Sequence, residues 1–236
     1  MKTVLCNGGG VNSAGMQIEM YRRGLRPDLT LFADTGGERP ETYAFVSELS
    51  RWLVAHGMDP IITVRVTGEL LEENCLRREA LPSVAYGFKT CSQRWKSEPQ
   101  EKYLNAWSGG EFYRKAIGFD AGEPQRAKAY KDAKCEAWYP LVEWDLDRDD
   151  CEAICREEGL FPAKSSCFFC PNMKRAEVLA LSEEHPDLYA RAVAMEQNAE
   201  LTAIRGLGRN WRWGDVHLQL PLFELDRAMP CGCYDG

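Results

Sequence analysis

The sequence predicts an α/β protein built on a doubly wound parallel sheet, with a helical, cysteine-rich part toward its C-terminal end. Three observations predict this fold class. Short apolar runs alternate with helical periodicity from residue 3 to residue 66, which is typical of a parallel sheet. Three glycines separate the first apolar run from the first helical pattern. Periodicity in the second half of the chain is mainly helical and surrounds a Cys-x-x-Cys turn.

The first elements alternate between strand and helix. Strands are expected over 3–6, 29–32 and 61–66, and helices over 12–23 and from Pro40 onward. In both helices apolar residues recur three or four positions apart, and glycine or proline marks the boundaries. Because ligands of open α/β sheets bind beyond the carboxyl ends of the strands, the loops that follow these strands are expected to form the site.

The rest of the chain is less regular. A polar stretch at 69–111 is expected to interrupt the core, and 113–119 is expected to resume it as a strand. Beyond it we expect a charged loop, three helices and an irregular tail, over 120–138, 147–158, 173–183, 186–204 and from Gly206. This order predicts an α/β core over 1–145, with an insertion near 69–111, and a helical cysteine-rich region over 146–236 packed on that core.

Composition is typical of a cytoplasmic protein. The 236 residues are 44% hydrophobic and 28% charged. No apolar run approaches the ~20 residues of a membrane helix, so no membrane partner is expected. The strand pattern begins at once, and no signal peptide is expected before it. The net charge of −7 argues against general nucleic-acid binding, for which a basic chain is typical, but leaves room for a local basic groove.

The ten cysteines fall into two groups. Disulfides are not expected in the cytoplasm, and five cysteines are expected to be small buried hydrophobic residues: Cys6, Cys75, Cys135, Cys151 and Cys155. The Cys167-x-x-Cys170 turn can instead hold zinc, hold an iron–sulfur cluster or carry dithiol chemistry. Because no histidine is near in sequence, all-cysteine ligation is expected, with Cys91, Cys231 and Cys233 as further ligands.

The strongest signal lies between the first strand and the first helix. Glycines let a backbone approach a phosphate, and the following helix presents free N–H groups and the positive end of its dipole. The loop lacks the Gly-Lys-Ser/Thr of a Walker motif and the third glycine of a dinucleotide motif. It suits a pyrophosphate, although a tight glycine turn would have the same sequence. The loop comprises Gly8, Gly9, Gly10, Val11, Asn12 and Ser13.

Other candidate residues follow later strands or lie in polar segments. Asp34 and Glu38 follow the second strand and could hold a ribose, a base edge or Mg²⁺. Two charged segments, 91–99 and 117–126, offer cations and carboxylates near the expected active face. Each of these charges could equally be solvated. The candidates that we select from the two segments are Lys96, Gly118, Glu123 and Arg126.

Taken in order, these segments resemble the phosphoadenosine phosphosulfate (PAPS) reductase group of the PP-loop, or adenine nucleotide α-hydrolase-like, superfamily. The resemblance extends from about residue 3 to residue 198. Its motifs are the PP-loop, the loop after the second strand, a Cys-Cys-x-x-Arg-Lys-x-x-Pro region, a Pro-Leu-x-x-Trp segment and a Cys-x-x-Cys, which match 8–13, 32–42, 91–99, 139–144 and 167–171. Gly8 and Asn12 replace the usual Ser and Asp of the PP-loop. Ser92 replaces the second Cys of a pair, so Cys231 or Cys233 would have to complete a cluster.

The resemblance implies a Rossmann-like PP-loop enzyme that binds ATP, with Mg²⁺, and cleaves or transfers at its α-phosphorus for sulfur transfer. It also implies a [4Fe–4S] cluster, with zinc as the alternative. The alternative activity is a sulfonucleotide reductase acting on PAPS or adenosine phosphosulfate. The candidate catalytic residues are Ser13, Asp34, Lys96 and Arg126, and the candidate nucleotide-binding residues are the glycine loop, Asp34, Gly118 and Glu123.

A third function class is a non-catalytic Cys₄-metal module that binds nucleic acid. Arginines and tryptophans interleave near the end of the chain, which suits stacking on bases, although they could equally pack a structural tail. These residues are Arg205, Arg209, Trp211, Arg212 and Trp213. The expected partners are therefore an adenine nucleotide and a nucleic-acid or sulfur-carrier substrate, and the chain could form a homodimer.

Overall fold

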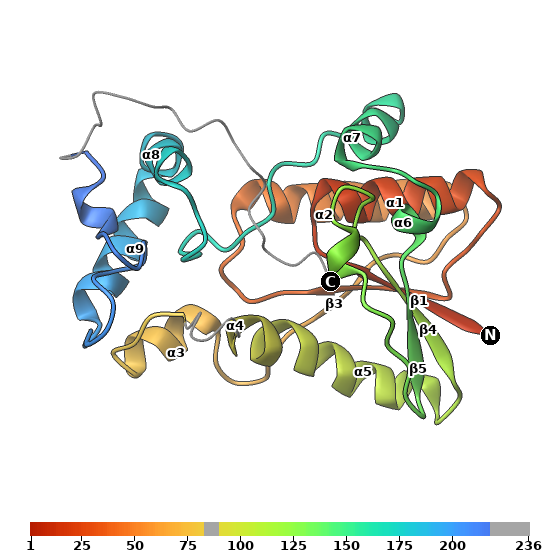
Figure 1. The fold of residues 1–236 in the computed structure, drawn as a ribbon, viewed down its shortest axis with the longest axis horizontal. Coiled ribbons are helices and arrows are strands. Elements are labelled where there is room, and N and C mark those ends of the chain that lie inside the picture. The colour runs from red at the N-terminus through yellow and green to blue at the C-terminus, as the bar shows by residue number, and fades with distance from the viewer. Residues whose placement is uncertain (83–89, 218–236) are drawn as a thin grey trace.

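The chain forms one parallel sheet covered by helices (Figure 1). The computed structural model describes residues 1–82 and 90–217. Its five strands lie in the order β3-β2-β1-β4-β5, and each neighbouring pair is parallel. The strands are β1 (Lys2–Asn7), β2 (Leu29–Ala33), β3 (Ile62–Val64), β4 (Tyr113–Ile117) and β5 (Cys135–Trp138). The predicted doubly wound parallel α/β fold is confirmed.

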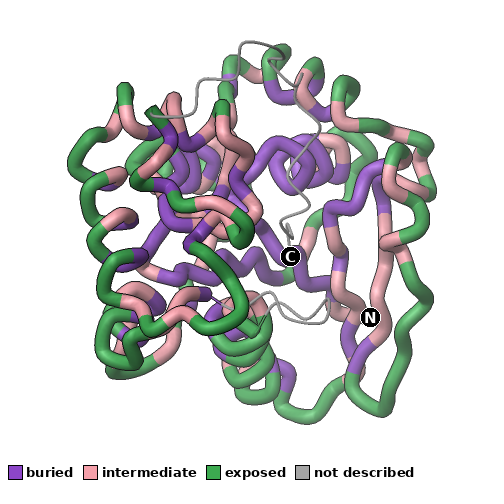
Figure 2. Tube along the Cα trace, turned by 60° about the vertical axis from the view of Figure 1, so that its left-hand side comes forward, coloured by how far each residue is buried: buried purple, intermediate pink, exposed green. Residues whose placement is uncertain are grey.

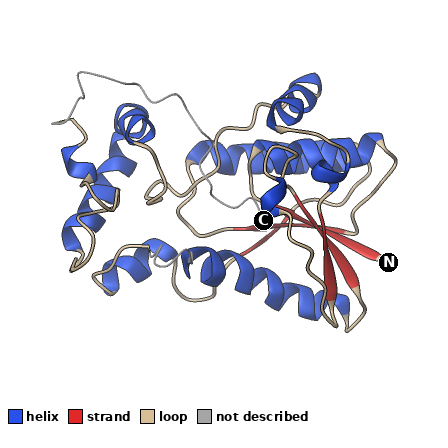
Figure 3. Cartoon of the chain, viewed as in Figure 1, coloured by secondary structure: helices blue, strands red, loops and turns tan. Residues whose placement is uncertain are grey.

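Helices pack on both faces of the sheet, as Figures 1 and 3 show. They are α1 (Val11–Arg22), α2 (Pro40–Ala55), α3 (Leu71–Arg77), α4 (Thr90–Ser92), α5 (Glu98–Ser108), α6 (Pro140–Glu143), α7 (Arg148–Glu157), α8 (Arg175–Glu184) and α9 (Pro186–Asn198). A π-helix, η2 (Gln93–Ser97), leads into α5, and two 3₁₀ turns are η3 (Pro124–Arg126) and η4 (Trp213–Asp215). None of the described helices is long and apolar enough to cross a membrane.

The two faces of the sheet bury different side chains because successive residues of a strand point to opposite sides. On one face, Leu5 of β1 packs in a cluster with apolar residues of α1, α2, α6 and α7. On the other face, Val4 packs with Leu104 of α5 and with residues of β2 and β3. Every residue of β2 is buried, as expected for an inner strand of a parallel sheet. In Figure 2 the buried stretches run through the middle of the molecule.

A third apolar cluster lies apart from the sheet and joins α3, α8, α9 and the segment after α9. Its largest buried side chains are Phe168, Phe169 and Trp213. The cluster meets the sheet through the Cys-rich turn, since Cys167 forms an isolated bridge with Glu38 and the Phe168 N–H donates to the Gly37 carbonyl at 2.8 Å. The helical part of the chain is thus attached to the loop that follows β2. The division at residue 145 stays a prediction.

One strand lies where a loop was expected. Strand β5 occupies 135–138, inside the predicted charged loop, and that prediction is wrong over these residues. As an edge strand, β5 buries only Cys135 fully and therefore lacks the continuous apolar run that identifies inner strands. In the polar stretch 69–111, helix α5 buries Leu104 against the sheet and bridges β3 to β4.

The five cysteines expected to be structural are all buried. Cys151 and Cys155 lie on α7 and pack in the cluster around α1. Burial raises the pKa of the thiols of Cys75 and Cys155 to about 12. These thiols therefore stay protonated at neutral pH and act as small hydrophobic groups, as predicted.

Candidate active site

The glycine loop and the end of β4 meet where the winding of the sheet reverses. From β1 the chain proceeds outward to β2 and β3, then crosses back to β4 on the other side of β1. The register pairs Cys6 of β1 with Ile117 of β4, so residues 8–13 and Gly118 follow adjacent strands. In doubly wound sheets this switch point is where ligands bind, because the loops on either side diverge there.

The backbone of the loop is shaped by Gly9. Its φ of +76° lies in the left-handed region, which residues with a side chain rarely adopt. A Cβ added at Gly9 would lie 2.9 Å from Thr42 Cγ2 and 3.2 Å from Phe32 Cε2. Helix α1 begins at Val11, so its first N–H groups, which have no acceptor in their own helix, belong to the loop.

A buried polar network holds the loop in place. The Asn7 side-chain oxygen accepts a hydrogen bond from the Gly9 N–H at 2.7 Å. The Ser13 hydroxyl lies 3.3 Å from the same oxygen, 3.0 Å from the Gly10 carbonyl and 3.3 Å from the Gly8 N–H, from which it accepts. Ser13 is fully buried. The structure therefore gives Ser13 the role of fastening the loop to the end of β1.

The segment after β4 packs against the glycine loop. A Cβ added at Gly118 would lie 3.2 Å from the Ser13 nitrogen, so a larger residue would press on the loop. Asn12 donates from its amide to Asp120 Oδ2 at 2.7 Å, and the Gly122 N–H donates to Asp120 Oδ1 at 2.9 Å. Asn12 Oδ1 is buried and finds no hydrogen-bond partner within the described residues. An unpaired buried amide oxygen is costly in a folded protein unless a ligand or water completes it.

Asp34 is placed beyond β2 as predicted, but its carboxylate is bound within the protein. Oδ1 accepts from the Gly36 N–H at 2.7 Å and from the Tyr43 hydroxyl at 2.8 Å, and Oδ2 forms an ion pair with Arg65. Asp34 is only 1% exposed. Burial and this carboxylate raise the pKa of Tyr43. Asp34 thus connects three segments: the loop after β2, helix α2 and the residue after β3. In this structure its role is to hold these segments together.

Lys96, which is half-buried, and Glu38, which is buried, form an ion pair beside the Cys-rich turn. Lys96 Nζ lies 3.2 Å from Glu38 Oε1. Glu38 Oε2 is buried without a hydrogen-bond partner among the described residues. The Cys167 thiol lies 3.1 Å from the Thr35 hydroxyl and 3.8 Å from Glu38 Oε1. This group of side chains brings one cation, one carboxylate and one thiol to the carboxyl end of β2.

Arg126 and Glu123 pair with each other on the far side of the switch point. Arg126 Nη1 lies 2.5 Å from Glu123 Oε2, and its guanidinium carbon lies 4.2 Å from the centre of the Phe119 ring. Both residues come from the segment after β4 that also carries Gly118 and Asp120. Their predicted roles in catalysis and nucleotide binding stay predictions.

The predicted metal ligands lie near one another without forming a metal site in the described residues. Cys91, Cys167 and Cys170 all border the third apolar cluster, around α3, α8 and α9. Burial, and then the charge of Glu38, raise the pKa of the Cys167 thiol. Within 1–82 and 90–217, no three His, Cys, Asp or Glu residues are grouped to hold a metal ion. Cys231 and Cys233 lie outside the described residues, so the metal site stays a prediction.

The sequence-based prediction of a cluster can be tested by metal analysis. Protein purified without oxygen is expected to contain iron and inorganic sulfide, because the predicted donor set is all cysteine. Cys167→Ala should remove both, whereas Cys6→Ala, which alters a buried thiol inside the sheet, should keep them. A wild-type protein without iron, sulfide or zinc would show that the prediction is wrong.

Several residues of this region have no motif of their own in the sequence. Asn7 and Gln17 extend the loop network, since Asn7 Nδ2 lies 3.4 Å from Gln17 Oε1 and Gln17 donates to Thr30 at 2.7 Å. Asp120 reaches Asn12 across 108 positions of sequence. The sequence offered one signal for Asn7 and Asp120, which is that each lies at or just after the end of a strand. It offered none for Gln17.

Comparisons with known proteins find structural likeness only. No protein-family model and no curated protein sequence matches the chain. Among solved structures, 27 chains match. One is the crystal structure of phosphoadenylyl-sulfate (PAPS) reductase from Candida auris in a phosphate complex, which is 15% identical over 69% of this chain and 75% of that chain, with a TM-score of 0.45. This likeness is distant and assigns no activity to the present chain.

Proposed function

We propose that the protein is a PP-loop enzyme that binds ATP through its phosphates on residues 8–13 and cleaves or transfers at the α-phosphorus. The observation that carries this proposal is the position of the glycine loop. The loop lies at the switch point of a parallel sheet, at the N-terminus of α1, with Gly118 packed against Ser13. A helix N-terminus and close-packed glycines are the features that phosphate groups need.

The buried polar atoms around the loop support a ligand. Asn12 Oδ1 and Thr42 Oγ1 are both buried and find no hydrogen-bond partner within the described residues. Thr42 is also the closest neighbour that a Cβ at Gly9 would meet, so both atoms belong to side chains around the loop. Phosphate oxygens accept from N–H and hydroxyl groups, and a ribose or bound water can donate to an amide oxygen. A nucleotide would therefore satisfy groups that the protein leaves incomplete.

In the proposed reaction, an acceptor oxygen attacks the α-phosphorus while the bond to the bridging oxygen breaks. Pyrophosphate leaves with the electron pair of that bond, and the acceptor becomes adenylated, ready to receive sulfur. The first N–H groups of α1 would hold the departing phosphates, and Lys96 and Arg126 would supply positive charge at the same edge of the sheet. Positioning and fixed charge are the main sources of rate in such transfers.

Mg²⁺ is compatible with the residues around the loop. This cation usually binds one or two carboxylates together with substrate phosphates, and it does not need a protein cage. Asp120 is hydrogen-bonded to Asn12 of the loop and is buried, so it is the carboxylate that we expect to hold Mg²⁺. Bound there, the ion would neutralise phosphate charge.

Ser13→Ala tests the role of the loop in ATP binding. Loss of the hydroxyl removes the contacts with Gly8 and Asn7, and the ATP affinity is expected to fall about tenfold, equivalent to about 1.4 kcal/mol. Ser47→Ala is the matched control. The Ser47 hydroxyl also donates to a backbone carbonyl of the preceding turn, that of Tyr43 at 3.0 Å, but it lies on the exposed face of α2. Isothermal titration with a non-hydrolysable ATP analogue measures both variants, and equal affinities would contradict the proposal.

Turnover distinguishes the proposed enzyme from a reductase. The wild-type protein is expected to release pyrophosphate from ATP when supplied with the acceptor or, slowly, with water. Sulfite release from PAPS with a thiol reductant, and no pyrophosphate from ATP, would replace the proposal with a sulfonucleotide reductase.

A further inference from the structure

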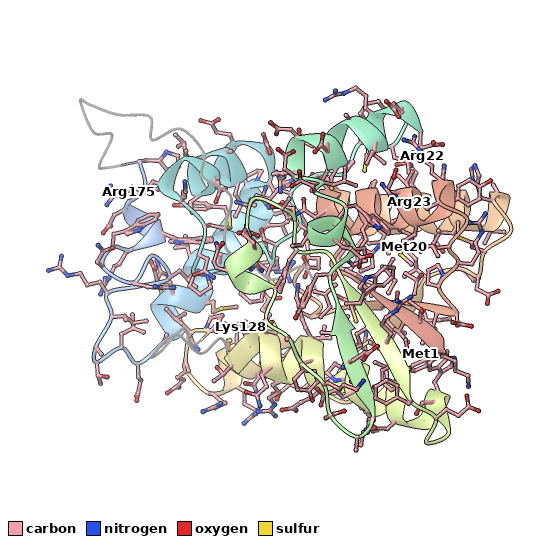
Figure 4. All side chains as sticks on the ribbon, turned by 45° about the vertical axis from the view of Figure 1, so that its right-hand side comes forward. Met1, Met20, Arg22, Arg23, Lys128 and Arg175 are labelled. Carbon is pink, nitrogen blue, oxygen red and sulfur yellow. The ribbon has the colours of Figure 1, made fainter. Side chains whose placement is uncertain are left out.

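A basic cleft lies on the segment after α9, at the end of the molecule formed by α8 and α9. Its volume is about 440 Å³, and its lining includes Arg175, Arg205, Arg212, Asn210 and Trp211. Figure 4 labels Arg175 on the side of the molecule opposite Met1, at the start of α8. None of the residues that line this cleft belongs to the glycine loop, residues 8–13.

The charge of the cleft contrasts with that of the whole chain. The net charge of the protein is −7, yet the lining contains three arginines and one acidic residue, Asp215. Arg205 and Arg212 are exposed and, in the described part of the chain, neither forms an ion pair. Arginine without a carboxylate partner attracts phosphate strongly, because its planar guanidinium donates two parallel hydrogen bonds.

The cleft is preformed by a buried carboxylate. Glu196 of α9 accepts from the backbone N–H groups of Leu207, Trp213 and Gly214 at 2.6, 3.0 and 3.3 Å. Arg212 in turn donates to the Arg205 carbonyl at 3.2 Å. These bonds fix the backbone that carries the arginines, so a ligand would bind without ordering a loop, which lowers the cost of binding.

Trp211 supplies an aromatic wall. The guanidinium carbon of Arg175 lies 4.7 Å from the centre of its ring. The other contact comes from Gly208, where an added Cβ would lie 2.2 Å from Trp211 Cε2. The ring is half-buried and lies between Arg175 and the backbone of Gly208.

An apolar cleft of about 270 Å³ adjoins the basic one. Its lining includes Leu81, Pro171 and Leu207, and it shares Leu201 and Ile204 with the basic cleft. Ile204 is 40% exposed at this shared border. Phosphate-binding arginines next to an apolar recess match the alternation of charged backbone and flat bases in a nucleic acid strand.

We propose that this surface, which we call the arginine cleft, docks single-stranded nucleic acid, with phosphates on Arg205 and Arg212 and a base in the adjoining apolar cleft. A nucleic acid strand has a phosphate and a flat base in every unit, whereas an acidic peptide carries aromatic rings only at particular positions, so the apolar neighbour favours nucleic acid. The inference goes beyond the proposed function and does not depend on ATP turnover.

Fluorescence anisotropy with a labelled 20-nucleotide DNA strand tests the proposal. The full-length protein is expected to bind, and the affinity should fall with salt because each phosphate contact contributes about −0.7 to the slope of log K against log salt. Arg205→Glu/Arg212→Glu should weaken binding about tenfold or more and reduce the slope by about 1.4. Arg51→Glu/Arg156→Glu changes the net charge equally at two exposed arginines elsewhere and should bind like the wild type.

Two results would overturn the proposal. The first is equal loss of binding in the two double variants, since it would show attraction to overall charge alone. The second is competition by polyglutamate as effective, per unit charge, as competition by unlabelled DNA, since it would favour an acidic protein partner. Neither readout uses ATP. A protein that does not turn over ATP would therefore contradict the proposed function without contradicting the proposal for the arginine cleft.

Discussion

Gly9→Ala is expected to abolish detectable ATP binding. An alanine at a φ of +76° costs about 1–2 kcal/mol. Its Cβ would also lie 2.9 Å from Thr42 Cγ2, closer than carbon atoms pack. The loop or α2 must therefore move, which would displace the N-terminus of α1, to which the proposed function assigns the phosphates. Isothermal titration should show at least about a 100-fold loss of affinity, equivalent to about 2.8 kcal/mol.

Gly57→Ala separates backbone strain from the contact with Thr42. Gly57 has a φ of +73°, nearly that of Gly9, but a Cβ added there meets no atom within 4 Å. This control should lose about 1 kcal/mol of stability and keep the ATP affinity of the wild type. If Gly9→Ala binds ATP as well as Gly57→Ala does, residues 8–13 are an ordinary turn and the phosphates bind elsewhere.

Glu196→Ala is expected to have the largest effect on stability. The change removes a buried carboxylate that accepts three backbone hydrogen bonds, and it leaves those N–H groups without acceptors. Hydrogen bonds to charged groups contribute about 1.5–3 kcal/mol each, but their losses overlap when one side chain makes all three. We expect the free energy of unfolding in urea to fall by about 3–5 kcal/mol.

The matched variants identify the source of that loss. Glu183→Ala removes an exposed carboxylate from the neighbouring helix α8 and should change stability by less than about 0.5 kcal/mol. Glu196→Gln keeps the shape of the side chain but removes its charge. One of the two polar atoms of the amide can no longer accept a hydrogen bond. The decrease in the free energy of unfolding should therefore lie between the decreases of Glu183→Ala and Glu196→Ala. Equal stability of Glu196→Ala and Glu183→Ala would show that the segment after α9 is held by its apolar contacts instead.

Much of the sheet could be predicted from the sequence because its inner strands are continuous apolar runs. Strand β2 is buried throughout, and its mostly apolar sequence indicates that burial. Strand β5 could not be predicted, since an edge strand with one buried residue has the composition of a loop. Helix α7 was predicted within a residue of its ends because Asp147 caps it, accepting from the Asp150 N–H at 3.0 Å.

The candidate site was only partly predictable for a different reason. The glycine loop is a local pattern, and its position between β1 and α1 follows from neighbours in sequence. The pairing of Asn12 with Asp120 and the bridge between Glu38 and Cys167 join residues more than a hundred positions apart. Asp34 was correctly placed beyond β2, but no sequence pattern shows that its carboxylate is already bound to Tyr43 and Arg65.

The contact between Gly118 and the loop has a consequence for how the protein matures. Strand β1 lies between β2 and β4, so until β4 joins it one side of β1 is an unpaired edge. The wall formed by Gly118 and Asp120 is likewise missing until that moment. A nascent chain that ends before residue 112 can therefore pair β1, β2 and β3 while the glycine loop still lacks its contacts with Gly118 and Asp120. Contacts between segments so distant in sequence form slowly, so the proposed nucleotide site would be completed only after β4 has joined the sheet.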